Sequence, residues 1–191
     1  MDAITLLKQD HKTVEKLFKQ FEKSTRPAEQ RKLAQKVIRE LSVHAAIEEM
    51  VFYPAVRGRV PKTEDTVLES LEEHHVVKWV LSELEDMQPD HERFKAKMTV
   101  LIESVRHHVK EEESELFPDV RKEIKRKELA ELGGALEKAK KTAPTRPHPR
   151  APDTPPGNLV AGPAAAVVDT ASGAVGKAET KVKNAVGGKK K

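Results

Sequence analysis

The chain contains no cysteine, few aromatic residues and no long hydrophobic run. The lack of cysteine excludes disulfide bridges, iron–sulfur clusters and thiolate zinc sites. No stretch reaches the roughly 18 apolar residues that indicate a transmembrane helix. The N-terminal segment MDAITLLKQDHKTVEK also lacks the apolar core of a signal peptide. We therefore expect a cytoplasmic protein.

Charge is abundant but unevenly distributed. Charged residues make up 35% of the chain and hydrophobic residues 37%, which favours an all-helical domain with charged outer faces. Residues 138–191 carry 11 Lys and Arg against 3 Asp and Glu, whereas residues 1–137 carry 24 against 28. An acidic body is not typical of a nucleic-acid-binding domain, so we expect none. Weak contact with polyanions or a membrane is expected of the basic tail alone.

The composition changes near residue 140, which divides the chain into a helical domain (1–140) and a Pro/Ala/Gly/Lys-rich basic tail (141–191). Seven of the 12 prolines lie between Ala143 and Pro163, which predicts an extended, disordered linker that buries little surface. Further along, small residues recur at alternating spacings of three and four. Either a helix that forms on contact or plain disorder fits this pattern. The residues are Val168, Ala171, Val175, Ala178, Val182 and Ala185.

Four segments of residues 1–137 have apolar residues every three or four positions, which predicts four amphipathic helices. Short breaks near 25–27 and 87–89 predict antiparallel hairpins, and hence an up-down-up-down four-helix bundle. We expect Thr63 to cap the third helix, Pro89 to lie in the first turn of the fourth, and a shorter helix near 127–139 to pack at one end. The stripes are Ile4, Leu7, His11, Val14, Phe18 and Phe21; Leu33, Val37, Leu41, His44, Glu48, Val51 and Ala55; Val67, Leu71, His74, Leu81 and Leu84; and Phe94, Met98, Leu101, Val105, His108, Glu112 and Leu116.

These stripes include four histidines and two glutamates at positions where a bundle needs apolar side chains. An unpaired carboxylate in such a core costs several kcal/mol or takes up a proton. A compensating partner is therefore expected.

The two halves of the domain repeat each other. HAAIEEMVFYP at 44–54 and HVKEEESELFP at 108–118 share one template: His, three residues, Glu-Glu, then an aromatic residue and Pro. DHKTVEKLFKQFE at 10–22 likewise matches EHHVVKWVLSELE at 73–85. Each half is thus a hairpin with one His on its first helix and His-x-x-x-Glu on its second, a spacing that places His and Glu on one face.

The depths of these residues in the bundle agree. His11 lies about 15 residues before the first turn and His44 about 18 after it, which differ by less than one helical turn. Pseudo-twofold packing would bring six side chains into one layer. They are the candidate metal ligands His11, His44, Glu48, His74, His108 and Glu112. Imidazole and carboxylate ligands without sulfur suit iron or manganese, and also zinc or copper, and two facing carboxylates favour a bridged pair of metals.

Other polar residues lie near the candidate ligands in the sequence. His75 and His107 adjoin candidate ligands but point about 100° away along the helix, so we interpret them as flanking residues. Glu49 and Glu113 either orient ligands or are ordinary surface charges. Tyr53 is expected in core or groove packing, with a position near the site as the alternative. His91 and His148 are expected in solvent, and Trp79 and the phenylalanines between packed helices.

Three other interpretations of the six polar core residues explain the sequence less well. A ferritin-like site needs two Glu-x-x-His motifs, and the chain has only Glu72-x-x-His75. A haem held by two of the histidines would leave the buried glutamates unexplained. A bundle without metal would make all six polar core positions coincidental.

The motifs resemble those of the hemerythrin-like (HHE cation-binding) family, over roughly residues 3–125. The matching elements are His11, His44-x-x-x-Glu48, His74 and His108-x-x-x-Glu112, followed by the FYP and LFP endings. The resemblance implies a four-helix bundle with a non-haem di-iron centre, bridged by oxo or hydroxo and by Glu48 and Glu112, with the four histidines as terminal ligands. Manganese or zinc is less expected. It also implies binding of, or reaction with, O₂, peroxide or NO.

The sequence departs from the oxygen-carrying hemerythrins, which have a fifth histidine on the third helix and a bridging Asp on the fourth. Here Lys78 stands four residues after His74, and Glu112 replaces the Asp. The resemblance then implies two five-coordinate irons with open positions, which favours catalase-like or peroxidase-like chemistry over oxygen carriage. The alternative is a metal-binding sensor or interaction protein with a structural site and a tail that contacts a partner. The polar faces predict a monomer.

Overall fold

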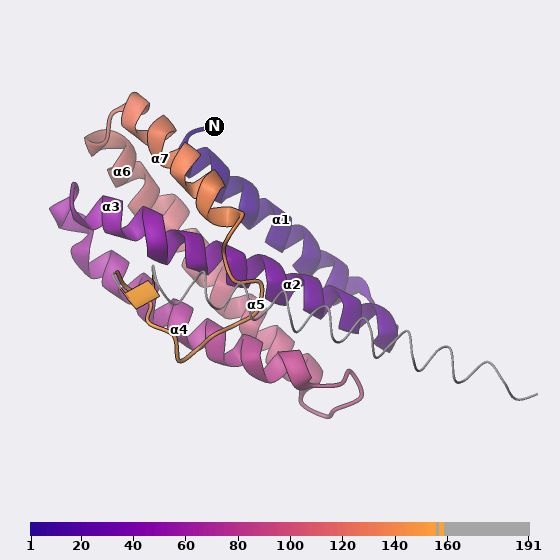
Figure 1. Ribbon diagram of the computed structural model, residues 1–191. Helices are drawn as coiled ribbons and strands as arrows, with labels where there is room; N and C mark the ends of the chain where they lie inside the picture. The colour runs from indigo at the N-terminus through magenta and orange to yellow at the C-terminus, as the bar shows by residue number, and fades with distance from the viewer. Residues whose placement is uncertain (156, 159–191) are drawn as a thin grey trace, which may run out of the picture.

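Figure 1 shows the computed structural model, which describes residues 1–155 and 157–158. Within these residues all regular elements are helical, and the predicted bundle is confirmed. The four long helices are α1 (Ala3–Lys23), α2 (Pro27–Ile47), α4 (Glu64–Asp86) and α5 (Phe94–Glu111). Helices α1 and α2 form one hairpin and α4 and α5 the other, and α2 packs on α4 as α1 does on α5.

Each hairpin's second helix continues past its candidate glutamate through a π-helical turn. Helix α2 runs into η1 (Glu48–Phe52) and α3 (Tyr53–Arg57), and α5 runs into η3 (Glu112–Leu116) and α6 (Phe117–Glu123). In each π-turn the N–H of the fifth following residue, Tyr53 or Phe117, bonds to the glutamate carbonyl. Proline comes next in both cases and has no N–H with which to restore the α-helical pattern.

The first π-turn changes which residues face the core. An unbroken α-helix would bury Val51 and Ala55, as the stripe predicted, but these two are only half-buried. Phe52 and Val56 are buried instead. One extra residue per turn rotates the following residues, and the regular spacing fails at that point.

Two helix starts also differ from expectation. Helix α5 begins at Phe94, so Pro89 lies in the preceding loop, where turn bonds such as His91 N–H to Gln88 O fold the chain. Thr63 does precede α4, after the 3₁₀ turn η2 (Pro61–Thr63), but its hydroxyl donates to the Val60 carbonyl and does not cap the helix.

The additional helix α7 (Arg126–Lys140) packs against the start of α1, as Figure 1 shows, and confirms the predicted short helix. Gly133 allows the close approach, because a Cβ there would lie 2.2 Å from the Met1 carbonyl oxygen. Leu129, Leu132 and Leu136 bury the inner face of the helix.

The core consists of two separate apolar clusters along the bundle axis. One joins α7 to the N-terminal part of α1 and includes Ile4, Leu7, Phe52 and Phe117. The other lies toward the two hairpin turns and includes Phe18. All five phenylalanines are buried, as expected. The polar candidate residues lie between the clusters, a position that keeps bulk water away from them.

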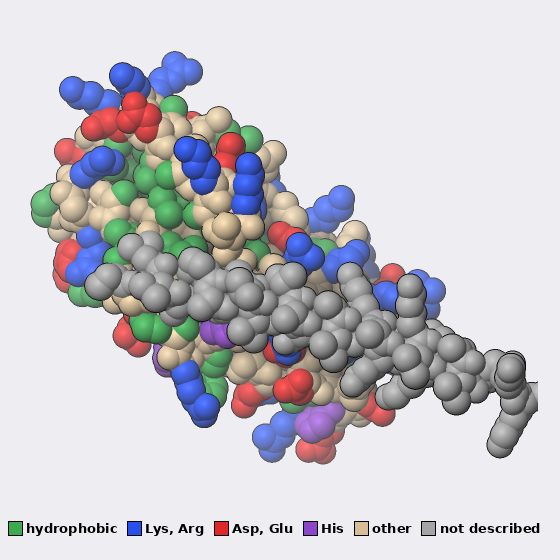
Figure 2. All heavy atoms as spheres, in the orientation of Figure 1, with side chains coloured by type: hydrophobic (Ala, Val, Ile, Leu, Met, Phe, Trp, Pro, Cys, Tyr) green, Lys and Arg blue, Asp and Glu red, His purple; other side chains and the backbone are tan. Residues whose placement is uncertain are grey.

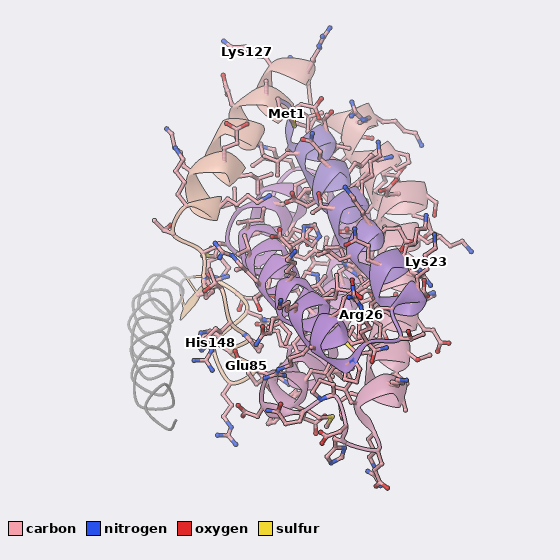
Figure 3. The ribbon with its side chains drawn as sticks, turned by 90° about the vertical axis from the view of Figure 1, so that its right-hand side faces the viewer. Met1, Lys23, Arg26, Glu85, Lys127 and His148 are labelled. Atoms are coloured by element: carbon pink, nitrogen blue, oxygen red, sulfur yellow. The ribbon has the colours of Figure 1, made fainter. Side chains whose placement is uncertain are left out.

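The C-terminal segment, defined here as residues 141–155 and 157–158, follows α7 as irregular chain and lies along α2 and α4. The proline-rich sequence predicts that this segment buries little, yet Ala143 and Asn158 are buried. Arg146 Nε donates to Glu85 Oε1 at 2.6 Å, and Figure 3 shows His148 and Glu85 close together on this side. Specific polar contacts with the bundle therefore hold this proline-rich stretch. The predicted tail beyond it, including the small-residue stripe, lies outside the described residues.

Trp79 corrects another prediction, because it is 41% exposed. It follows Lys78, whose side chain turns inward, and so points away from the core. Its ring contacts surface groups of the chain: its Nε1 donates to His75 Nε2 at 3.2 Å, and the Arg150 guanidinium lies 5.8 Å from the ring centroid. On the face shown in Figure 2, basic and acidic side chains are interspersed around hydrophobic ones. Among the described residues no helix is long and apolar enough to cross a membrane.

Candidate metal centre

The structure brings all six candidate ligands into one buried layer. His11, His44, His74 and His108 come from α1, α2, α4 and α5. Glu48 and Glu112 are the first residues of the two π-turns. None of the six is more than 5% exposed. Each hairpin contributes two histidines and one glutamate, as the sequence repeat predicted.

The first half of the layer gathers four donors, from His11, His44, Glu48 and Glu112, within 4.8 Å of one another. The Nε2 atoms of His11 and His44 are 3.2 Å apart. His11 Nε2 lies 3.2 Å from Glu112 Oε2, and His44 Nε2 lies 3.2 Å from Glu48 Oε2. One cation placed among these atoms would meet two imidazoles and two carboxylates.

The second half repeats the arrangement with His74 and His108, whose Nε2 atoms are also 3.2 Å apart. Glu48 joins this group as well, with Oε2 3.5 Å from His74 Nε2. Glu112 Oε2 lies 3.6 Å from His108 Nε2. Glu48 therefore belongs to both groups, and Glu112 lies between a histidine of each. The two carboxylates thus lie between the two pairs of histidines.

The buried carboxylates lack the partners that such groups need. Both oxygens of Glu48 and Oε2 of Glu112 have no hydrogen bond from any described residue. Burial raises the pKa of Glu48 well above its ordinary value, and the nearby charge of Glu112 raises it further. Burial acts on Glu112 too, but the charges of His108 and His11 outweigh it and lower its pKa. Unpartnered buried oxygens that face four imidazoles fit divalent or trivalent cations, which would replace the protons.

Two of the four histidines, His44 and His74, are shifted toward the neutral form that binds metal. Burial lowers the pKa of His44 to about 4 despite the neighbouring Asp10. Burial also lowers the pKa of His74, although Glu49 acts against it. For His108, burial is outweighed by the charge of Glu112 and by Glu73, and the pKa rises. A cation would replace the proton of His108 and be stabilised by the same carboxylates.

A second layer of carboxylates holds the outer ring nitrogens. His11 Nδ1 lies 2.9 Å from Glu113 Oε1, and His74 Nδ1 lies 3.1 Å from Glu49 Oε1. The same repeat places Glu73 2.7 Å from His108 Nδ1 and Asp10 3.8 Å from His44 Nδ1. An Nδ1–H donated to a carboxylate leaves Nε2 free as a ligand and orients the ring. Of the two interpretations of Glu49 and Glu113, the orienting one is supported.

Asp10, Glu73 and the hydroxyl contacts of Tyr53 are not among the site residues predicted from the sequence. The signal for the first two was present, because an acidic residue precedes the His in both DH and EH. Tyr53 was assigned to packing. It is buried as expected, but its hydroxyl donates to Glu112 Oε1 at 2.9 Å and lies 3.5 Å from His74 Nε2. Burial and the charge of Glu112 raise the pKa of Tyr53, which keeps the hydroxyl protonated and able to donate.

Lys78, at the position of the missing fifth histidine, is buried but turned away from the ligand atoms. Its Nζ lies 2.7 Å from Glu49 Oε1 and 2.8 Å from Glu49 Oε2. Glu49 thus connects an ammonium group to the His74 ring. The lysine neutralises a carboxylate that would otherwise be buried and unpaired.

The flanking histidines lie outside the layer, as predicted. His75 and His107 are both exposed, and so is His91, whereas His148 is only half-buried because the C-terminal segment lies against α2 and α4. His107 Nε2 lies 3.3 Å from Glu111 Oε1 and 4.0 Å from Glu73 Oε1, a surface cluster of ordinary charged groups.

The fold and the buried layer define a helical bundle with a His/Glu site for cations. The sequence pattern of the Hemerythrin HHE cation binding domain matches residues 2–120, more than half of the chain. The chain belongs to this family, which confirms the resemblance drawn from the motifs.

Three known proteins illustrate the relationship. An uncharacterized hemerythrin-like protein of Schizosaccharomyces pombe is 33% identical over 131 residues, which cover 68% of this chain and 64% of that protein. A DNA nickase of Nostoc sp. is 27% identical over 140 residues, 73% of this chain but 39% of the nickase. The chain thus spans less than two thirds of either relative. The crystal structure of a Hemerythrin HHE cation binding domain-containing protein from Mycobacterium kansasii has the same fold, with a TM-score of 0.63 and 23% identity over 74% of this chain and 86% of that one.

Proposed function

We propose that the buried layer binds two iron ions and that the protein uses them to bind or consume a small oxidant, with peroxide favoured over O₂ and NO. The observation that carries the proposal is the pair of unpartnered carboxylates, Glu48 and Glu112, which lie between two pairs of histidines. Within each pair the two Nε2 atoms are 3.2 Å apart. Iron bound there would supply redox chemistry and open coordination positions for the ligand.

The surrounding residues support this chemistry. Glu113, Glu49 and Glu73 hydrogen-bond the rings of His11, His74 and His108 and so keep their Nε2 atoms in place without the metal. Asp10 lies near the His44 ring, but at 3.8 Å from Nδ1 it makes no hydrogen bond. The Tyr53 hydroxyl donates a hydrogen bond to Glu112, with its oxygen 2.9 Å from Oε1, and so places a proton beside a candidate ligand. Apolar side chains, including Leu41, Val77 and Val105, enclose the small space beside the rings and exclude bulk water.

Metal content tests the site first. Protein from cells grown with ample iron should contain about two irons per chain, and the double variant Glu48→Ala/Glu112→Ala should contain almost none. Glu69→Ala/Glu115→Ala is the matched control, because both residues are exposed and lie on the same elements as site residues. Metal-free parent protein would refute the proposal, and equal loss in the control would show that the effect is not local.

Peroxide turnover tests the reaction. His44→Ala should lower the turnover rate at least about tenfold, since one metal position loses a ligand. His107→Ala should leave it unchanged, because His107 is exposed and adjoins a ligand without facing the layer. A fully loaded protein that neither consumes peroxide nor binds O₂ or NO would instead favour the alternative, a sensor in which the site is structural.

A further inference from the structure

A large groove lies between α1 and α5, with a volume of about 1020 Å³. Val14, Phe18, Val105 and Val109 form its apolar floor. It runs along α1 from His11 to Lys23, a distance of about 18 Å at the rise of an α-helix. In Figure 3, α1 adjoins the pink helices at the right, opposite the C-terminal segment at the left. No part of the described chain fills the groove.

The pseudo-equivalent groove, between α2 and α4, is closed by the protein itself. The C-terminal segment covers it with Pro144, Pro147 and Asn158 and leaves only about 50 Å³. Asn158 anchors the segment, because its Nδ2 donates to the Glu49 carbonyl at 2.9 Å. One face of the bundle therefore has an occupant supplied by the chain, whereas the α1–α5 face has a cavity of the size used for small molecules.

The charge around the open groove is opposite to that of the domain. Six cationic side chains line it against two carboxylates, while residues 1–137 carry more acidic than basic residues. Both carboxylates are already paired, Glu15 with Arg106 at 3.0 Å and Glu113 with Lys8 at 3.2 Å. Lys19 also lies 3.5 Å from Glu15, but the other four lysines make no ion pair within the part of the chain that the structure describes. They are Lys12, Lys16, Lys23 and Lys110.

The floor of the groove is also the wall of the candidate metal centre. Val14, Val105, Val109 and His11 line both the groove and the small space of about 20 Å³ beside the four ligand histidines. A molecule lying in the groove would be one side chain away from the ligand layer. The apolar wall therefore connects an outer binding surface with the inner site.

We propose that the α1–α5 groove binds a long-chain carboxylate, with its acyl chain on the valine and phenylalanine floor and its carboxylate among the unpaired lysines. A linear amphiphile fits an elongated groove with an apolar floor and a cationic rim. The basic tail does not fit, because its charge matches that of the rim and the described chain ends on the α2–α4 face. This binding does not depend on the iron chemistry.

Titration calorimetry of the full chain with oleate, below its micelle concentration, tests the proposal. We expect saturable binding near one per chain, at least tenfold weaker binding of laurate and of uncharged oleyl alcohol, and none of butyrate. Hydrogen exchange should slow in residues 12–23 and 105–110 and not in α2 or α4. Equal affinity for oleyl alcohol, absence of binding, or protection on the α2–α4 face would overturn the proposal.

Charge reversal provides the matched variants. Lys16→Glu/Lys110→Glu should weaken oleate binding at least tenfold. Lys36→Glu/Lys127→Glu makes the same change in net charge at exposed positions on α2 and α7. This control should change the affinity for oleate less than twofold. Equal effects of the two double variants would show nonspecific attraction.

Two other results would assign the groove to another occupant. A lysine-dependent association with anionic vesicles but not with monomeric oleate would assign it to a membrane. A concentration-dependent dimer that buries the groove would assign it to a second copy of the chain. Metal content is measured on the same samples, so a failure to bind oleate is distinguished from a failure of the iron site.

Discussion

The hairpins α1–α2 and α4–α5 match closely around the ligand atoms and differ on the surfaces outside them. His11 and His74, and likewise Glu113 and Glu49, occupy equivalent places with similar distances. Outside this layer, Glu15 in the first hairpin corresponds to Lys78 in the second, 63 residues later. The inner layer is repeated because both halves must present the same donors to one space. The outer faces have no such requirement and carry separate features.

The largest expected effect distinguishes shared from unshared ligands. Glu48→Gln should abolish binding of both cations, because Glu48 belongs to both donor groups. His11→Ala and His74→Ala should each remove about one cation, because each histidine belongs to one group. Metal content per chain by mass spectrometry measures this. If Glu48→Gln lost no more metal than His11→Ala, the two groups would not share a carboxylate.

Metal removal should strongly destabilise the bundle, by several kcal/mol, because it leaves buried carboxylates without partners. In the metal-free state, Glu48→Gln should be more stable than the parent. The raised pKa of Glu48 means that the folded state resists ionisation. As the pH rises above the unfolded carboxyl pKa of 4.5, the free energy of unfolding of the metal-free parent therefore falls by up to about 1.4 kcal/mol per pH unit, until the pH reaches the folded pKa.

The gain from Glu48→Gln should thus be small below pH 4.5 and grow as the pH rises. Urea unfolding of both metal-free proteins across this range measures it, with the exposed Glu69→Gln as control. A gain that shrank with rising pH would mean that the folded pKa is not raised.

The orienting carboxylates should have intermediate effects of unequal size. Glu49→Gln and Glu113→Gln should each lower metal affinity by about 10–100-fold. Glu49 should lie at the upper end, because it is buried and holds both His74 and Lys78, whereas Glu113 is a third exposed. Competition with a chelator gives both affinities, and a larger effect at Glu113 would reverse the assignment.

The smallest effect concerns the covered α2–α4 face. Asn158→Ala should free the C-terminal segment locally, at a cost of about 1–3 kcal/mol, because a buried backbone carbonyl loses its donor. Hydrogen exchange should accelerate in residues 141–155 and stay constant in α1 and α5. Thr154→Ala, at an exposed position of the same segment, is the control. Unchanged exchange in Asn158→Ala would show that other contacts anchor the segment.

The long-range arrangement of the layer followed from the sequence because repetition and helical spacing are both visible in it. His11 and His74 occupy matching positions in repeated phrases, and a helical bundle has few ways to bring them together. The π-turns were not predicted. Their cause, a proline placed so that one carbonyl has no α-helical donor, does not change the pattern of apolar residues until Phe52 and Val56.

Contacts that depend on rotamers and irregular chain were also missed. The sequence around Tyr53 does not distinguish a packing role from a place at the site. Only the rotation after the π-turn brings its hydroxyl to Glu112. Proline-rich sequence predicted a free linker, but one asparagine aimed at the Glu49 carbonyl holds the segment. In the π-turn that carbonyl would pair with residue 54, which is a proline, so the bond fills a gap that backbone geometry creates.

A chain without cysteine cannot form a disulfide cross-link, but a cation at the carboxylates Glu48 and Glu112 would provide a cross-link of another kind. Glu112 comes from one hairpin, and His11 and His44 come from the other, so a cation held by all three would join Glu112 to residues 101 and 68 positions earlier in the chain. Such a bond acts as a cross-link between the two halves, and it is reversible. Chelation would act on this bundle as reduction acts on a disulfide-linked protein: it would loosen the association of the hairpins while leaving each one's own helices paired.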